Sequence, residues 1–239
     1  MLIDLHPEPA DMARVVIEGM ERRPRQLPAW LLYDEEGSRL FEAICEQPEY
    51  SLTRTESQLL EEQAGAIAAV LEAAGVRSPL LLEFGAGNAR KVGPLLEALE
   101  PTTYAALDIS LSALTGVCSE IQGRHPALPV VGICCDVSRL ERLPEHPLLT
   151  AAGRLGFYPG SSIGNFDPPA AGRLLRQFGR LLGAGGTLLV GIDQPKPVER
   201  LEAAYNDRAG CSAAFALNLL RRLNRDLGGS FDPADFDYR

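Results

Sequence analysis

The chain has 239 residues, of which 46% are hydrophobic, and its formal net charge is −9. This length and apolar fraction suit one large globular domain, or one domain with a smaller lobe. The acidic balance argues against a nucleic-acid partner, because phosphate binding needs clustered Lys and Arg. The five cysteines form no C-x-x-C pair, which argues against a zinc site or a disulfide framework, and we expect no metal.

The N-terminal stretch "MLIDLHPEPADMARVV" carries acids and a proline where a signal peptide needs a basic start and an apolar core. No apolar run is long enough to cross a bilayer. We therefore expect a cytoplasmic protein that does not contact a membrane.

Short apolar runs alternate with helical patterns along the middle of the chain. The predicted strands are Leu80–Phe84, Thr103–Asp108, Val130–Cys134, Leu155–Tyr158 and Thr187–Ile192. The predicted helices are Glu56–Ala74, Val92–Leu99, Ser110–Ile121 and Pro169–Leu182. This alternation predicts a doubly wound α/β fold with a mainly parallel sheet of five strands, buried on both faces.

The two flanks of the chain do not fit that sheet. The N-terminal flank holds the only tryptophan, Trp30, and the T-x-x-E sequence from Thr53 to Glu56 predicts a capping box at a helix start. The C-terminal flank is mostly helical in pattern and is interrupted by prolines and glycines. We predict a core over 61–194 and a helical substrate lobe formed by 1–60 and 195–239.

The stretch "LLLEFGAGNARK" joins the first of these strands to a turn that contains Gly85 and Gly87. Glycines let the backbone turn sharply and approach a ligand, although a tight strand-to-helix turn with no ligand is the simpler alternative. Asp108 lies 23 positions after Gly85, close to the spacing at which an acid binds ribose hydroxyls in doubly wound folds. Arg90 occupies the position of the third glycine in a dinucleotide fingerprint, which argues against a pyrophosphate. The carboxylate of Glu83 would also repel a pyrophosphate and would suit a cationic ligand.

These features resemble the class I S-adenosylmethionine-dependent methyltransferases, whose first motif reads E/D-x-G-x-G. "LGAGGTLLVGID" is similar to the hairpin that leads into the fifth strand of that fold, with Ala184 in place of a proline. Asp136, in "CCDVSRL", stands where this fold commonly holds the adenine amino group.

Five further segments resemble a narrower family, the histidine-specific Nα-methyltransferases of ergothioneine biosynthesis. They are "LLYDEEGSRLFEAICEQPEYSLTRTE", "EFGAGNARK", "LDIS", "YPGSSIGNF" and "LEAAYNDRAGCSAAFALNLLRRLNRDLG". The resemblance runs from about Leu27 to the end of the chain. It implies transfer of methyl groups from S-adenosyl-L-methionine to the α-amino group of L-histidine, giving trimethylhistidine (hercynine), by a monomeric enzyme with a small-molecule substrate.

The resemblance assigns binding roles and no catalytic acid or base. The residues expected at the cofactor are Gly85, Gly87, Lys91, Asp108, Asp136 and Val137, the last standing where a phenylalanine is usual. The residues expected at the amino acid substrate are Tyr50, Asn165, Tyr205 and Tyr33.

Each of these roles has a structural alternative. Tyr50 and Tyr205 could be half-buried residues of the lobe, and Asn165 could belong to a helix N-cap near Asp167. Lys91 is unusual in a first helical turn, where cations are disfavoured, and a ligand carboxylate or solvent exposure would explain it.

The chain also departs from the family pattern. Ser51 and Leu52 replace the usual tyrosine and proline after Tyr50. Family members continue for roughly another third of this length, and that part would supply the last two strands of the sheet and the contacts to the substrate ring. Three alternatives therefore remain open: a methyltransferase of another amino acid, an inactive cofactor-binding fragment, and an NAD-dependent oxidoreductase. Arg90 weighs against the last of these.

Overall fold

A computed structural model describes residues 1–5, 9–87, 89–151 and 153–239 of the protein. The chain forms two compact units. The first, called here the sheet unit, comprises Met1–Leu5 and Leu52–Gln194; the second, called the helical unit, comprises His6–Ser51 and Pro195–Arg239. These bounds differ from the predicted ones, since residues 1–5 and 52–60 belong to the sheet unit.

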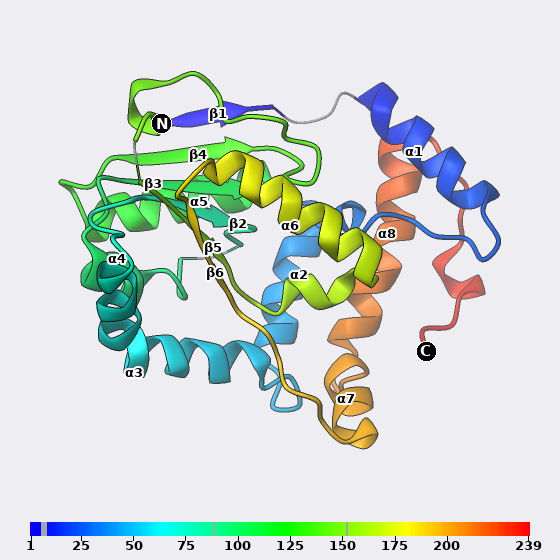
Figure 1. The fold of residues 1–239 in the computed structure, drawn as a ribbon. Coiled ribbons are helices and arrows are strands. Elements are labelled where there is room, and N and C mark those ends of the chain that lie inside the picture. The colour runs from blue at the N-terminus through cyan, green and yellow to red at the C-terminus, as the bar shows by residue number, and fades with distance from the viewer. Residues whose placement is uncertain (6–8, 88, 152) are drawn as a thin grey trace. The chain divides into compact units, whose positions relative to one another are not determined.

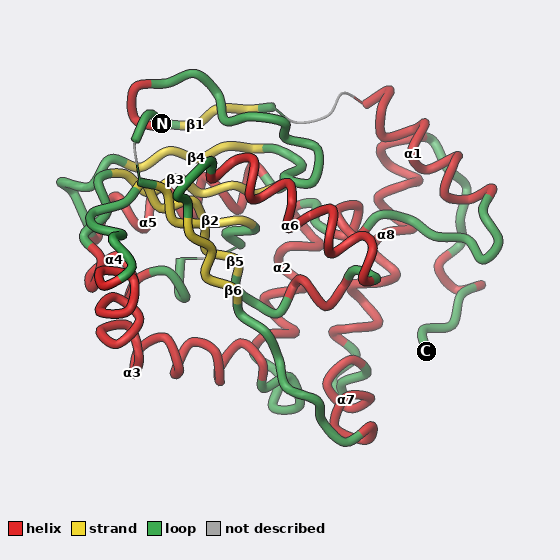
Figure 2. The backbone as a smooth tube through the Cα atoms, in the orientation of Figure 1, coloured by secondary structure: helices red, strands yellow, loops and turns green. Residues whose placement is uncertain are grey.

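The sheet unit is built on one parallel sheet in the order β1-β4-β3-β2-β5-β6 (Figure 2). The strands are β1 Leu2–Asp4, β2 Leu80–Phe84, β3 Thr103–Asp108, β4 Val130–Cys134, β5 Arg154–Tyr158 and β6 Thr187–Val190. The doubly wound α/β fold is thus confirmed, with all five predicted strands present. The predicted number of strands was wrong, because the described residues form a sheet of six strands.

The additional strand is β1, which pairs in parallel with β4 at the edge of the sheet. Its three residues are too few to show a periodic pattern, and two of them are exposed. The pairing depends on contacts that the sequence pattern does not reveal. The N-terminal ammonium donates to the carbonyl of Val130 at 3.0 Å. Leu2 packs over Gly132, where an added Cβ would lie 2.5 Å from the Leu2 side chain.

Helices cover both faces of the sheet (Figure 1). They are α3 Leu52–Ala73, α4 Gly93–Leu99, α5 Leu111–Arg124 and α6 Pro168–Leu182, with short 3-10 turns at η2 Pro147–Leu149 and η3 Ser162–Asn165. Successive side chains of a strand point to opposite faces. Leu81 therefore joins the core under α3, α4 and α5, whereas Phe84 joins the core under α6, where its ring stacks on Phe178 with 4.1 Å between centroids.

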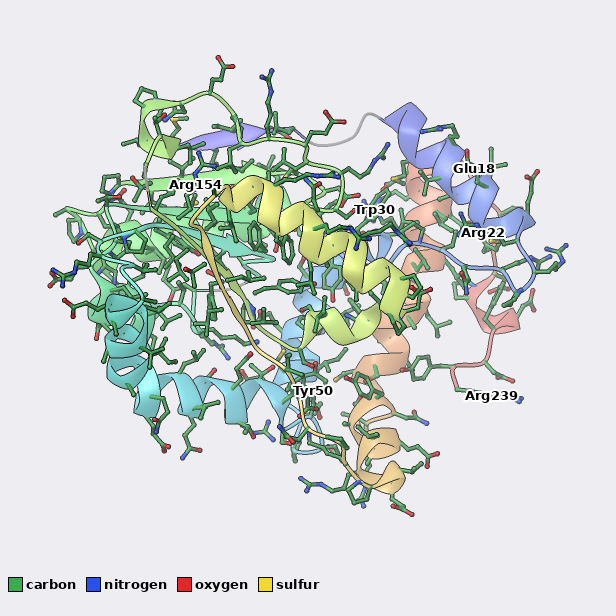
Figure 3. All side chains as sticks on the ribbon, in the orientation of Figure 1. Glu18, Arg22, Trp30, Tyr50, Arg154 and Arg239 are labelled. Atoms are coloured by element: carbon green, nitrogen blue, oxygen red, sulfur yellow. The ribbon has the colours of Figure 1, made fainter. Side chains whose placement is uncertain are left out.

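Residues from both ends of the chain form the helical unit. Its elements are α1 Pro9–Glu21, η1 Ala29–Leu32, α2 Glu35–Cys45, α7 Val198–Tyr205, α8 Cys211–Leu227 and η4 Pro233–Asp235. Asp34 caps α2 by accepting the N–H of Gly37 at 2.8 Å, and it also accepts from Asn218 and Arg225 of α8, each at 2.8 Å. Trp30, labelled in Figure 3, lies under the guanidinium of Arg222, which is 5.9 Å from the ring centroid.

Among the described residues, no helix combines the length and the apolar character needed to cross a membrane.

Candidate functional site

The strand order of the sheet reverses at β2, which lies between β3 and β5. In open α/β sheets, ligands bind beyond the carboxyl ends of the strands at this reversal. The turn with Gly85 and Gly87 follows β2, and the segment that contains Asn165 follows β5. The fold therefore brings two groups of predicted site residues to the edge where a ligand is expected.

The glycine turn has a backbone that favours glycine. The φ angles of Gly85 and Gly87 are +76° and +51°, in the left-handed region where other residues are strained. The N–H groups of Gly85 and Ala86 both donate to the carbonyl of Leu107, which fixes the turn against β3. A Cβ added at either glycine would meet no atom within 4 Å, so a ligand can approach the backbone here.

Asp108, at the end of β3, is held by two backbone amides. Its two carboxylate oxygens accept from the N–H of Gly87 at 3.0 Å and the N–H of Ser110 at 2.9 Å. Burial raises the pKa of this carboxyl, while these amide hydrogen bonds act to lower it. Each carboxylate oxygen can accept a second hydrogen bond. The side chain is thus fixed in place and retains capacity for ligand hydroxyls.

Glu83 is buried inside the sheet unit, with 1% of its surface exposed. One carboxylate oxygen accepts from the hydroxyl of Tyr104 at 2.5 Å, and the other, Oε1, is buried without a hydrogen-bond partner among the described residues. Burial raises the pKa of Glu83 to about 8, while the hydrogen bond from Tyr104 and the charge of Lys91 act to lower it. The raised pKa favours the uncharged carboxyl, which weakens charge repulsion as a reason to exclude a pyrophosphate and leaves Arg90 as the main one.

Lys91 precedes α4, which begins at Gly93, and does not lie in a helical turn as the sequence suggested. Its ammonium lies 2.7 Å from Oε2 of Glu56, and both side chains are largely buried. The ion pair explains the cation at this position without solvent exposure. The predicted capping box is wrong, because α3 begins at Leu52 and already contains Thr53. The pattern also missed this tertiary role of Glu56.

Asp136 and Val137 follow β4, next to the end of β3. Oδ1 of Asp136 accepts from both the N–H and the hydroxyl of Ser138, which turns the chain away from the strand. Val137 packs against the core under α6. Both residues are partly exposed at the same edge of the sheet as Asp108.

Asn165 is the last residue of η3 and is exposed. The alternative role as a helix cap is wrong, because Asp167 caps α6 by accepting the N–H of Ala170 at 2.7 Å. Asn165 therefore sits beyond β5 with no role in starting the next helix.

The three tyrosines predicted at the substrate belong to one aromatic cluster in the helical unit. Tyr50, labelled in Figure 3, is buried, and its ring meets that of Tyr205 edge-on with 5.8 Å between centroids. Tyr33 joins through Phe41 and Phe215, with centroids 5.6 Å and 5.4 Å away. Phe41 also lies 6.5 Å from Tyr50. Neither phenylalanine was predicted from the sequence, since no local pattern links two positions so far apart in the chain.

Tyr205 ends α7 and has 54% of its surface exposed. Its carbonyl accepts from the hydroxyl of Tyr238 at 2.5 Å. Two residues later, Asp207 is buried and accepts the N–H groups of Cys211 and Ser212 at the start of α8. The backbone of Tyr205 is therefore bonded to Tyr238, and the chain two residues later is fixed to the start of α8 by Asp207.

The sheet-unit residues fit an adenosyl cofactor. The left-handed glycine turn leaves its backbone open, and Asp108 offers fixed acceptors to hydroxyls. Within the described parts of the chain, no group of three or more His, Cys, Asp or Glu side chains is placed to hold a metal ion.

Comparison with known proteins identifies the group to which this arrangement belongs. A family described as "Histidine-specific methyltransferase, SAM-dependent" matches residues 12–239. A histidine N-alpha-methyltransferase of Mycobacterium tuberculosis is 32% identical over 231 residues, which cover 95% of this chain and 69% of that protein. An N-methyltransferase of Aspergillus fumigatus is 31% identical over 238 residues, which cover 93% of this chain and 61% of that protein.

Among solved structures, an S-adenosylmethionine-dependent methyltransferase from Clostridium acetobutylicum aligns with 65% of this chain and 57% of its own, at 15% identity and a TM-score of 0.44. The family match covers nearly the whole chain, including the glycine turn, Asp108 and the aromatic cluster. The chain belongs to the family of histidine-specific, S-adenosylmethionine-dependent methyltransferases.

Proposed function

We propose that this protein transfers methyl groups from S-adenosyl-L-methionine to the α-amino nitrogen of L-histidine, giving hercynine in ergothioneine biosynthesis. The observation that carries the proposal is the glycine turn with Asp108 at the reversal of strand order, in a chain that matches the family over residues 12–239. The relative from Mycobacterium tuberculosis, named for histidine methylation, supports histidine as the substrate.

In this proposal the sheet unit holds the cofactor, which supplies an electrophilic methyl group when it is bound. Gly85 and Gly87 present open backbone, and Asp108 accepts the ribose hydroxyls. Asp136 and Val137 contact the adenine. Lys91 has three N–H donors, one of which points to Glu56, so two remain for a cofactor carboxylate.

The amino acid is held by polar groups and aromatic rings. By the family resemblance we assign Asn165 and Tyr205 to its carboxylate and Tyr50 to its amino group, with Tyr33 as a further member of the aromatic cluster. We assign no catalytic acid or base, because partial removal from water already favours the neutral amine that must react. Alignment of the reacting atoms can supply roughly 7–11 kcal/mol of the acceleration in favourable cases.

The aromatic cluster also suits the positive charge that grows on the methylated nitrogen. A ring face stabilises a cation by about 0.5–2 kcal/mol. Two tyrosine rings that meet edge-on, as Tyr50 and Tyr205 do, can present one face and one hydroxyl to the same group. Tyr50→Ala should therefore raise the KM for the amino acid. The Kd for the cofactor should change less than this KM does.

A second candidate substrate is another primary amine of amino acid size. The relative from Aspergillus fumigatus, named only as an N-methyltransferase, is nearly as similar to this chain as the histidine enzyme is. We further propose that the enzyme is monomeric and acts in the cytoplasm.

The test is a reaction of the purified chain with S-adenosylmethionine and a panel of amino acids, followed by mass spectrometry. Stepwise addition of three methyl groups to histidine supports the main proposal. Methylation of another amino acid and not of histidine supports the second candidate. Cofactor binding without any product would leave a cofactor-binding protein, and a folded protein that binds no cofactor would contradict both proposals.

A further inference from the structure

Glu56 is the fifth residue of α3, and its side chain is 11% exposed. Two groups approach it. The ammonium of Lys91 lies 2.7 Å from Oε2, and the N–H of Gly160 donates to both oxygens, at 2.8 Å and 2.9 Å. A buried charge is tolerated when it is paired and hydrogen-bonded in this way.

The partners of Glu56 come from segments that follow different strands. Lys91 follows β2 and Gly160 follows β5. The carboxylate also lies directly over Gly191, after β6, where an added Cβ would be 2.0 Å from Oε1. One side chain thus contacts the segments beyond three strands at the edge of the sheet where ligands are expected.

The contact at Gly160 holds a turn that is unfavourable on its own. Gly160 has φ +81° and Ser161 has φ +54°, which is uncommon for a residue with a side chain. Such turns persist when surrounding contacts fix them. Glu56 provides one contact, and Ser161 provides another by accepting the N–H of Asp193 at 3.0 Å. This turn leads directly into η3, which ends at Asn165.

We propose that Glu56 is a positioning residue that links the two halves of the site within the sheet unit. Its ion pair orients Lys91 on the cofactor side, and its hydrogen bonds to Gly160 set the turn that carries Asn165 on the substrate side. The assignment of these two sides rests on the proposed function, while the link itself rests on the contacts of one carboxylate.

Three substitutions separate the two contacts. Glu56→Gln keeps an oxygen that can accept from Gly160 but loses the charge that pairs with Lys91. Lys91→Met removes the ammonium and leaves the Gly160 contact in place. Glu56→Ala removes both contacts. Glu61→Gln is the matched control, because Glu61 is exposed on the same helix.

Two measurements on the full chain need no turnover. Calorimetry gives the affinity for S-adenosylmethionine, and hydrogen exchange followed by mass spectrometry reports the amides of 159–166. We expect Glu56→Gln and Lys91→Met to weaken cofactor binding about tenfold, the loss of one charge-assisted contact, with exchange at 159–166 unchanged. Glu56→Ala should weaken binding and also speed this exchange, while Glu61→Gln changes neither.

Where turnover is measurable, Glu56→Ala should raise the KM for the amino acid and Glu56→Gln should not. Equal cofactor affinity in Glu56→Gln and the wild type would overturn the cofactor side of the link. Unchanged exchange at 159–166 in Glu56→Ala would overturn the substrate side. If the wild type proves inactive on every amino acid, the proposed function fails, but binding and exchange still decide whether Glu56 links the two segments.

Discussion

At the scale of single residues, burial changes what a side chain can do. Glu83 lies in β2 and Asp108 lies at the end of the neighbouring strand β3. The pKa of each carboxyl is raised mainly by burial. The sequence pattern placed Asp108 at the end of β3, as the structure shows, while its role in ribose binding stays a prediction. It could not predict the raised pKa of Glu83, because burial and the contact with Tyr104 depend on how the strands pair.

The raised pKa of Glu83 predicts how stability depends on pH. An unfolded glutamate titrates near 4.5 and the folded one at about 8, so between these values the folded protein keeps a proton that the unfolded chain releases. The free energy of unfolding therefore falls as pH rises through this window, by up to about 1.4 kcal/mol per pH unit for one group. Glu83→Gln cannot ionise, so its stability should fall less steeply.

Urea unfolding followed by circular dichroism at several pH values within this window measures the effect. A residual slope is expected in the variant, because the pKa of Asp108 is also raised. Glu61→Gln, on an exposed surface, should follow the wild type. Parallel curves for Glu83→Gln and the wild type would show that Glu83 is ionised in the folded protein.

Asp108→Asn tests the acceptor beside the glycine turn. An amide has one accepting oxygen, so either Gly87 or Ser110 would lose its partner and the ligand would lose an acceptor. Such a loss costs about 1–3 kcal/mol, which corresponds to roughly 5- to 150-fold weaker binding of S-adenosylmethionine by calorimetry. Asp167→Asn is the control, since asparagine also caps helices well. If Asp108→Asn binds S-adenosylmethionine with wild-type affinity, Asp108 does not contact the cofactor.

At the scale of helices and strands, long apolar runs made the central sheet predictable. β2, β3 and β4 are entirely or almost entirely buried, and their bounds agree with the predicted ones. β6 ends at Val190, two residues before the predicted end at Ile192, which is exposed. β1 was missed because three residues at an edge carry too little pattern, and their pairing depends on Leu2 packing over Gly132.

The start of α2 supports a prediction at this scale. Asp34→Ala would remove the helix cap at Gly37 and leave the amide of Asn218, which is 2% exposed, without its acceptor. Together these losses should lower the free energy of unfolding of the helical unit by about 2–3 kcal/mol. Unfolding followed through the fluorescence of Trp30, with hydrogen exchange along α2, measures this loss.

The control is Glu36→Gln on the same helix, since the exposed pair of Glu36 with Arg39 contributes little to stability. If Asp34→Ala is as stable as this control, the contacts of Asp34 with α8 do not hold the helical unit together.

At the scale of the whole molecule, the predictable and the unpredictable parts have different physical origins. Repeated burial of apolar strands and helices follows from patterns local to the sequence, so the fold class could be predicted. The gathering of Tyr33, Tyr50 and Tyr205 around Phe41 and Phe215 depends on contacts between the two ends of the chain. Only the resemblance to a family suggested those tyrosines, and neither the phenylalanines nor the buried ion pair of Glu56 followed from it.

The central claim is that this chain places methyl groups on the α-amino nitrogen of histidine. The most direct measurement uses S-adenosylmethionine with a ¹³C-labelled methyl group and L-histidine with ¹⁵N at the α position, and examines the product by NMR. We predict a one-bond coupling between ¹³C and ¹⁵N that places each new methyl group on the α nitrogen. A ¹³C signal on the imidazole ring, or no transfer to histidine by protein that binds the cofactor, would contradict the claim.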